Sequence, residues 1–171
     1  MNRRTIMAGL LALGLGLTAV AATNLTGTWV LDKSKSDPMR MGGPRSGGGG
    51  PRGDLNLTLV IRQSGNDLQI IRKISMGADE RPPVEQKFTL DGKECTNPLG
   101  GRGGTLTAKA KWNQDTLVIE GTQKMSTPNG DFDIDIKNEY SLSADGKTLT
   151  LVSTRSTPQG DTTTKQIFNK H

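Results

Sequence analysis

The chain has 171 residues and a formal net charge of +5. A nucleic-acid partner would require a concentrated basic face, so we expect no nucleic-acid binding from this mild excess. The single cysteine, Cys95, excludes an intramolecular disulfide. The single histidine, His171, is the last residue, and chain ends are usually poorly ordered. Catalytic and zinc sites that depend on an ordered imidazole are therefore not expected.

Residues 1–22 have the order of a secretory signal peptide. Arg3 and Arg4 precede an apolar run from Ile6 to Val20, which ends in small residues. The run is shorter than the roughly 20 residues that a bilayer requires, and no second apolar segment follows it. We expect export to the periplasm or the extracellular space, no integral membrane segment after signal removal, and a single domain over residues 23–171.

A Gly-, Pro- and Arg-rich stretch, residues 33–54, follows the first predicted strand. Its sequence, KSKSDPMRMGGPRSGGGGPRGD, contains almost no apolar side chains that could enter a core. Such a composition cannot bury enough surface to offset the entropy lost on ordering. The stretch is therefore predicted to be a flexible loop.

From Asp54 onward, apolar and polar residues alternate with a period of two. The pattern is clearest in LNLTLVIR (55–62), LTAKAKW (106–112) and DFDIDIKNEYSL (131–142). Alternation of this kind is typical of strands with one buried and one solvated face. Asn-Gly and Asp-Gly pairs between the segments favour tight hairpins. The sequence predicts an all-β, antiparallel up-and-down meander of about eight or nine strands, which we expect to close into a β-barrel because closure removes exposed edges.

Four blocks carry a resemblance to a known family: GTWVLDKSKSD, FTLDGKECTNPLG, KWNQDTLVIEG and YSLSADGKTLTLVSTRS. Gly27-Thr28-Trp29 at the head of the first strand resembles the lipocalins and the wider calycins. The four blocks in order resemble exported bacterial lipocalin-like domain proteins, a family of unassigned biochemical role. The resemblance implies that Trp29 closes one barrel end, that Gly27 allows close approach of the chain, and that a basic residue packs on the indole. Arg155 is the first candidate for that residue and Lys165 the second.

The interior of such a barrel is either filled by side chains or hollow enough for a ligand. We expect a protein without enzymatic activity that binds a small apolar or amphipathic ligand. A filled barrel serving as an envelope interaction or structural module is the alternative. The predicted cavity-lining residues are Leu57, Leu59, Ile70, Phe88, Trp112 and Tyr140.

Acidic side chains on the predicted strands raise two chemical alternatives. Asp131, Asp133 and Asp135 invite a calcium site, but they alternate with apolar residues, so we interpret them as the solvated face of a strand. Glu120 and Glu139 are the carboxylates that a glycoside hydrolase would need, but nothing in the sequence brings them together. We expect no catalytic residues, no metal and no cofactor.

Overall fold

The structure is a computed structural model. It describes residues 23–38, 55–100, 103–127, 130–158 and 160–171. The predicted signal peptide and residues 39–54 of the predicted loop lie outside these ranges. Within the ranges that the structure describes, no helix is long and apolar enough to cross a membrane.

The described residues form eleven β-strands. In chain order these are β1 (Gly27–Leu31), β2 (Leu55–Ser64), β3 (Asp67–Met76), β4 (Asp79–Glu80), β5 (Val84–Thr89), β6 (Asp91–Pro98), β7 (Thr105–Asn113), β8 (Thr116–Thr127), β9 (Gly130–Leu142), β10 (Thr148–Thr157) and β11 (Gly160–Lys170).

The all-β antiparallel meander is confirmed, but the predicted number of strands is too low. The two strands that the sequence did not reveal are β4 and β6. The first has only two residues, both exposed. The second, DGKECTNP, contains glycine, proline and charged residues and lacks a regular apolar alternation. Pairing with β7 makes β6 a strand in spite of its composition.

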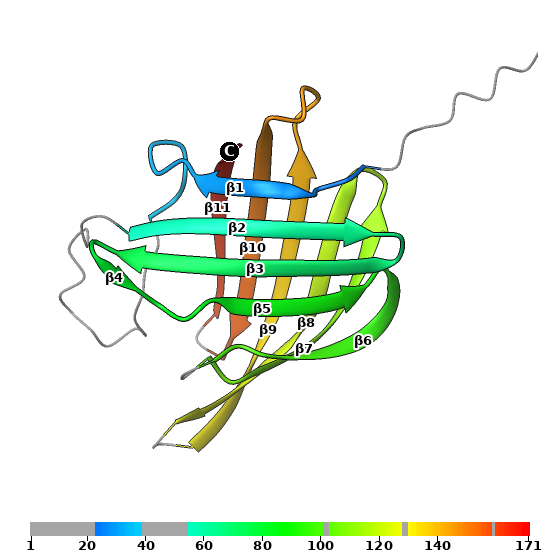
Figure 1. Cartoon of the computed structure of the whole chain (residues 1–171). Helices are drawn as coiled ribbons and strands as arrows, with labels where there is room; N and C mark the ends of the chain where they lie inside the picture. The colour runs from blue at the N-terminus through cyan, green and yellow to red at the C-terminus, as the bar shows by residue number, and fades with distance from the viewer. Residues whose placement is uncertain (1–22, 39–54, 101–102, 128–129, 159) are drawn as a thin grey trace, which may run out of the picture.

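The strands form a single antiparallel sheet in the order β4-β3-β2-β1-β11-β10-β9-β8-β7-β6, with β5 paired to β3. The first strand pairs with the last, where Trp29 is opposite Lys170. Figure 1 shows β1, β2, β3 and β5 crossing one side of the molecule, with β7 to β11 behind them as a second layer. The core lies between the two layers, because each strand turns its apolar face inward.

A side chain joins β5 to β6. These two strands follow each other in the chain but pair with different parts of the sheet, β5 with β3 and β6 with β7. The buried carboxamide of Asn97 accepts a hydrogen bond from the backbone N–H of Lys87 at 2.7 Å and donates one to the carbonyl of the same residue at 3.0 Å. The amide thus makes the pair of hydrogen bonds that the backbone of a neighbouring strand would make with Lys87. Closure into a barrel stays a prediction, because among the described residues the backbone ladder ends at β6 without returning to β5.

Trp29 occupies one end of the core and is fully buried. Its indole Nε1 donates a hydrogen bond to the carbonyl oxygen of Leu25 at 2.9 Å. The Lys170 ammonium lies 5.3 Å from the centre of the ring, within the range of a cation–π contact. A Cβ on Gly27 would lie 3.2 Å from Lys170 Cε and 3.4 Å from the indole nitrogen, so glycine leaves the room that these two side chains occupy.

The basic residue over Trp29 was predicted wrongly. Arg155 pairs with Thr162 on β11, whereas Trp29 pairs with Lys170. A strand rises about 3.3 Å per residue, which puts Thr162 and Lys170 roughly 26 Å apart along β11. Lys165, the second candidate, pairs with Val152 and has no place opposite Trp29. The register therefore assigns the cation to the last strand, and Arg155 to another part of the interior.

The first part of the predicted flexible loop is held against β11. The backbone N–H of Asp37 donates to the carbonyl of Lys165 at 2.8 Å, and the N–H of Lys165 donates to the Asp37 carboxylate at 2.6 Å. The N–H of Ile167 donates to the Ser36 hydroxyl at 2.8 Å. Ser and Asp side chains satisfy backbone groups in this way at turns. Residues 33–38 therefore include positions that bond to β11 beyond the end of its pairing with β1, contrary to the prediction that the flexible loop starts at residue 33.

We expect Trp29→Ala to lower the free energy of unfolding by about 3–5 kcal/mol, because it empties a fully buried aromatic site. Lys170→Ala should cost about 1 kcal/mol through the lost contact with the ring. The two losses should not add, since each change already removes the shared contact. Urea unfolding of both single variants and the double variant measures this coupling.

Lys165→Ala is the matched control for the cation, and Phe132→Ala, which removes an exposed aromatic, is the control for the ring. Strict additivity of the Trp29 and Lys170 changes would show that the ammonium contributes nothing at the ring.

Candidate functional site

The inner face between the two layers brings together all six residues predicted to line a cavity. Five of them are buried in one apolar cluster, and the sixth, Trp112, is half-buried and packs against it. The five are Leu57, Leu59, Ile70, Phe88 and Tyr140. Their side chains come from both layers, so both layers contribute to one apolar cluster. Their role in ligand binding stays a prediction.

Two arginines share this inward register. Arg72 on β3 lies between the inward-facing Ile70 and Ile74 and pairs with Leu59, which is fully buried. Arg155 on β10 pairs with the buried Ile136 on β9. Successive side chains of a strand point to opposite faces, so both arginines leave their strands on the core side. Among the described residues, neither guanidinium has an ion-pair or hydrogen-bond partner.

The two guanidinium groups interact electrostatically. Desolvation by the surrounding protein lowers the pKa of Arg155, and the positive charge of Arg72 lowers it further. Much of the Arg155 side chain is nevertheless accessible to solvent. A group inside an open hollow satisfies both observations, because protein atoms surround it while solvent still reaches it. Arg155 is therefore a charged group that protein atoms surround in part and that solvent still reaches.

Tyr140, on β9, places a polar group deep in the same interior. The residue is only 1% exposed, and its hydroxyl has no hydrogen-bond partner among the described residues. In this part of the chain, every side-chain nitrogen or oxygen that is sealed from solvent does have a partner. The Tyr140 hydroxyl is therefore not sealed, and it faces a space that can admit water. Burial raises the pKa of the phenol, and the nearby charge of Arg72 partly opposes that effect.

The sequence contained a signal for the two arginines that our interpretation did not use. Alternation of Leu68, Ile70 and Ile74 skips position 72, which the period of two assigns to the core face. Arg155 likewise continues the inward series of Leu149 and Leu151. A charged residue at an inward position of a strand indicates either an internal ion pair or a binding group.

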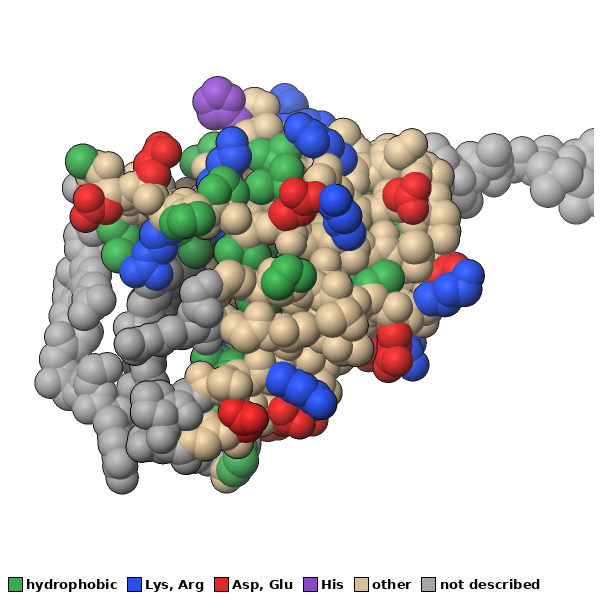
Figure 2. All heavy atoms as spheres, turned by 60° about the horizontal axis from the view of Figure 1, so that its bottom comes forward, with side chains coloured by type: hydrophobic (Ala, Val, Ile, Leu, Met, Phe, Trp, Pro, Cys, Tyr) green, Lys and Arg blue, Asp and Glu red, His purple; other side chains and the backbone are tan. Residues whose placement is uncertain are grey.

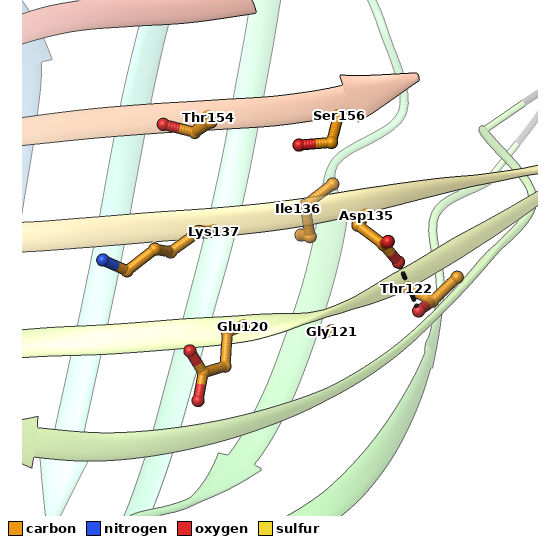
Figure 3. Close-up of a pocket in the computed structure, with 8 residues that line it drawn as sticks. All are labelled: Glu120, Gly121, Thr122, Asp135, Ile136, Lys137, Thr154 and Ser156. Atoms are coloured by element: carbon orange, nitrogen blue, oxygen red, sulfur yellow. Dashed lines mark hydrogen bonds between the residues drawn. The ribbon is translucent and has the colours of Figure 1, made fainter. Parts of the chain in front are cut away.

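A hollow of about 280 Å³ lies on the outer face of the sheet over β8, β9 and β10. Figure 3 shows its polar side chains on strands that run side by side, with Thr122 donating a 2.8 Å hydrogen bond to Asp135. It is open to solvent, and six of the eight residues that line it have polar side chains. Its lining consists of Glu120, Gly121, Thr122, Asp135, Ile136, Lys137, Thr154 and Ser156.

The carboxylates considered for hydrolysis belong to this outer face and are ion-paired. Glu120 forms an ion pair with Lys111, with 3.1 Å between Oε1 and Nζ. Glu139 forms one with Lys137, with 2.8 Å between the same two kinds of atom. The hydrogen bond with Glu139 raises the pKa of Lys137. Lys137 also pairs with Glu120 across the strands, so a lysine separates the two carboxylates. Exposed pairs of this kind contribute little energy, and they leave no paired acid and base around a reacting bond.

Asp131, Asp133 and Asp135 are exposed on β9, in agreement with their interpretation as a solvated face. Over the described ranges, no group of three or more His, Cys, Asp or Glu side chains is placed to hold a metal ion. Figure 2 shows acidic and basic side chains interspersed on the face that it displays.

Comparisons with known proteins define the fold. No protein-family model matches the chain, and no curated protein matches it. Among solved structures, the zebrafish ileal bile acid-binding protein complexed with cholic acid is similar, at 21% identity and a TM-score of 0.58, covering 86% of this chain and 98% of that one. Human cRBP IV is similar at 19% identity and a TM-score of 0.52, covering 87% and 99%. The likeness confirms a calycin-like fold.

We expect the phenol of Tyr140 to stay protonated in the folded protein at pH values where a free tyrosine ionises. Tyr140 is the only tyrosine, so absorbance at 295 nm follows it alone. The unfolded chain in guanidinium should titrate near pH 10, and the folded protein above it. Because the folded pKa is raised, this group's contribution to stability is complete below about pH 10 and is lost as the pH rises further.

A folded protein whose absorbance titrates at or below the midpoint of the unfolded chain would contradict the buried placement of Tyr140. Far-ultraviolet circular dichroism at each pH distinguishes ionisation in the native state from alkaline unfolding.

Proposed function

We propose that the protein binds a small apolar or amphipathic molecule in the space between the two layers of its sheet. In this proposal the sheet closes into a barrel, with Asn97 completing the connection between β5 and β6. The protein acts by binding and not by catalysis. The proposal includes export to the periplasm or the extracellular space, which rests on the composition of residues 1–22.

The observation that carries the proposal is the Tyr140 hydroxyl, which is deep in the interior and has no hydrogen-bond partner within the described ranges. Filled interiors pair such groups, because leaving one unpaired costs about 1–3 kcal/mol. A space that admits water next to a large apolar cluster is the usual composition of a small-molecule site. The interior also lacks the ion-paired carboxylates of the outer hollow, so its character is apolar with a few isolated polar groups.

One of the similar structures supports the binding of a small amphipathic molecule. The zebrafish protein is described as a bile acid-binding protein and was solved with cholic acid. The present chain spans nearly the whole length of that protein, so it possesses the complete two-layered architecture. The identity of the ligand does not follow from this likeness, since it establishes the fold alone.

The test is binding of N-phenyl-1-naphthylamine, a neutral dye whose fluorescence rises in apolar surroundings. Ser153 lies on the inner face of β10, beside Tyr140, and its hydroxyl donates to Asn138 Oδ1 at 2.7 Å. Ser153→Leu should narrow the interior and weaken dye binding by about tenfold, equivalent to about 1.4 kcal/mol. Thr154→Leu, on the outer face of the same strand, should leave the affinity unchanged.

Melting temperatures of both variants show whether the fold is retained. Absence of saturable dye binding by the unmodified protein would contradict the proposal and favour the filled barrel. Equal loss in the two variants would place the dye outside the interior.

A further inference from the structure

The interior carries positive charge that the described protein does not neutralise. We infer that the ligand of this site is an amphiphile with an anionic headgroup, held between the guanidinium groups of Arg72 and Arg155 with the Tyr140 hydroxyl as a further donor. The inference rests on the proposed function, because it specifies the class of molecule bound in the same interior.

The charge balance of the inner face is the first argument. The pairing register links every inward position from β1 to β11. At these described positions the sequence contains one acidic residue, Asp79, which is exposed on the short strand β4 opposite Met76 and forms no ion pair with either arginine. The polar neighbours of Arg155 in the inward register are neutral, and they include Asn138, Ser153 and Thr162. Both arginines retain contact with solvent, and an anion that enters beside them would meet two positive charges that no ion-paired carboxylate of the described residues neutralises.

Repulsion between the two arginines is the second argument for an anionic ligand. Arg72 and Arg155 come from different layers of the sheet, and yet the charge of one disfavours the charged form of the other. Two like charges that approach across an interior are stabilised by an anion between them. An arginine fork matches the oxygens of carboxylate, phosphate or sulfate groups, and it binds them through short, charge-assisted hydrogen bonds.

The hydroxyl of Tyr140 supplies an independent observation at the same place. It is nine-tenths buried or more, it has no partner among the described residues, and it senses the charge of Arg72. Because its phenol keeps its proton, it can donate a hydrogen bond to an anion that the arginines hold. Arg72 on β3 is thus within electrostatic range of a donor on β9, Tyr140, and of one on β10, Arg155.

Polarity along β10 indicates how the rest of the ligand lies. The inward series runs from Arg155 through Ser153 to Leu151 and Leu149, the last two fully buried. This polar-to-apolar gradient spans roughly 20 Å at the rise of a strand. It continues toward the end of the core that Trp29 closes, since Leu149 pairs with Phe168 and Phe168 pairs with Leu31. A headgroup at the arginines would thus direct an alkyl tail into the apolar cluster.

The experiment compares two probes of equal chain length, laurate and the uncharged dodecanol, as competitors of N-phenyl-1-naphthylamine. The unmodified protein should bind laurate at least about tenfold more tightly than dodecanol. Arg72→Gln and Arg155→Gln should each weaken laurate binding by about tenfold and change dodecanol binding by less than about twofold. Arg62→Gln, on the exposed outer face of β2, is the matched control and should change neither affinity.

Two further measurements keep the test decisive. Arg72→Lys and Arg155→Lys retain the charge, and they should recover part of the laurate affinity if either glutamine variant folds poorly. Added salt should weaken laurate binding and leave dodecanol binding unchanged. Equal affinities for laurate and dodecanol, or glutamine variants that weaken both probes alike, would overturn the anionic headgroup and leave the proposed function intact. Binding of neither probe, nor of the dye, would overturn the proposed function itself.

Discussion

Burial of one face of a continuous antiparallel sheet is the constraint on which the rest of this structure depends. With a strict period of two, each residue of a strand is committed either to the core or to solvent, and a slip of one residue would invert every assignment. The register between β1 and β11 fixes that commitment for the two ends of the meander, because it sets Trp29 opposite Lys170. The same register forces Arg72 and Arg155 onto the core side, although their chemistry favours the surface. An interior so specified is apolar at one end and cationic at the other.

The periodicity of the sequence was sufficient for the architecture. Alternation in segments such as 106–112 and 131–142 predicted antiparallel strands, and the structure confirms the meander and the burial of Leu57, Leu59 and Tyr140. The strands that escaped prediction lack this alternation, because β4 is too short and β6 is made a strand by its neighbours. The cation over Trp29 was assigned to the wrong strand for a related reason. A pattern within each strand says which face a residue joins, but only the pairing of strands says which residue it meets.

The site required information that no single segment contains. The donors at its centre come from β3, β9 and β10, and their proximity results from two layers folding over each other (Figure 1). Position 72 could have been recognised, since a charged residue interrupts an inward apolar series there. The scarcity of acidic side chains at the described inward positions could not, because it is a property of many strands together and not of any one segment. Asn97 is a similar case: its two hydrogen bonds join β6 to Lys87 on β5, and they leave no mark in the composition of β6.

The central claim is that the interior holds a small amphiphile whose negative charge balances the arginines. Native mass spectrometry tests it most directly, on protein isolated from its own source without detergent or organic solvent. The account predicts a species heavier than the polypeptide, which loses the additional mass on denaturation and releases an anionic amphiphile detectable in negative-ion mode. The bare mass of the polypeptide, both as isolated and after incubation with excess laurate, would contradict it.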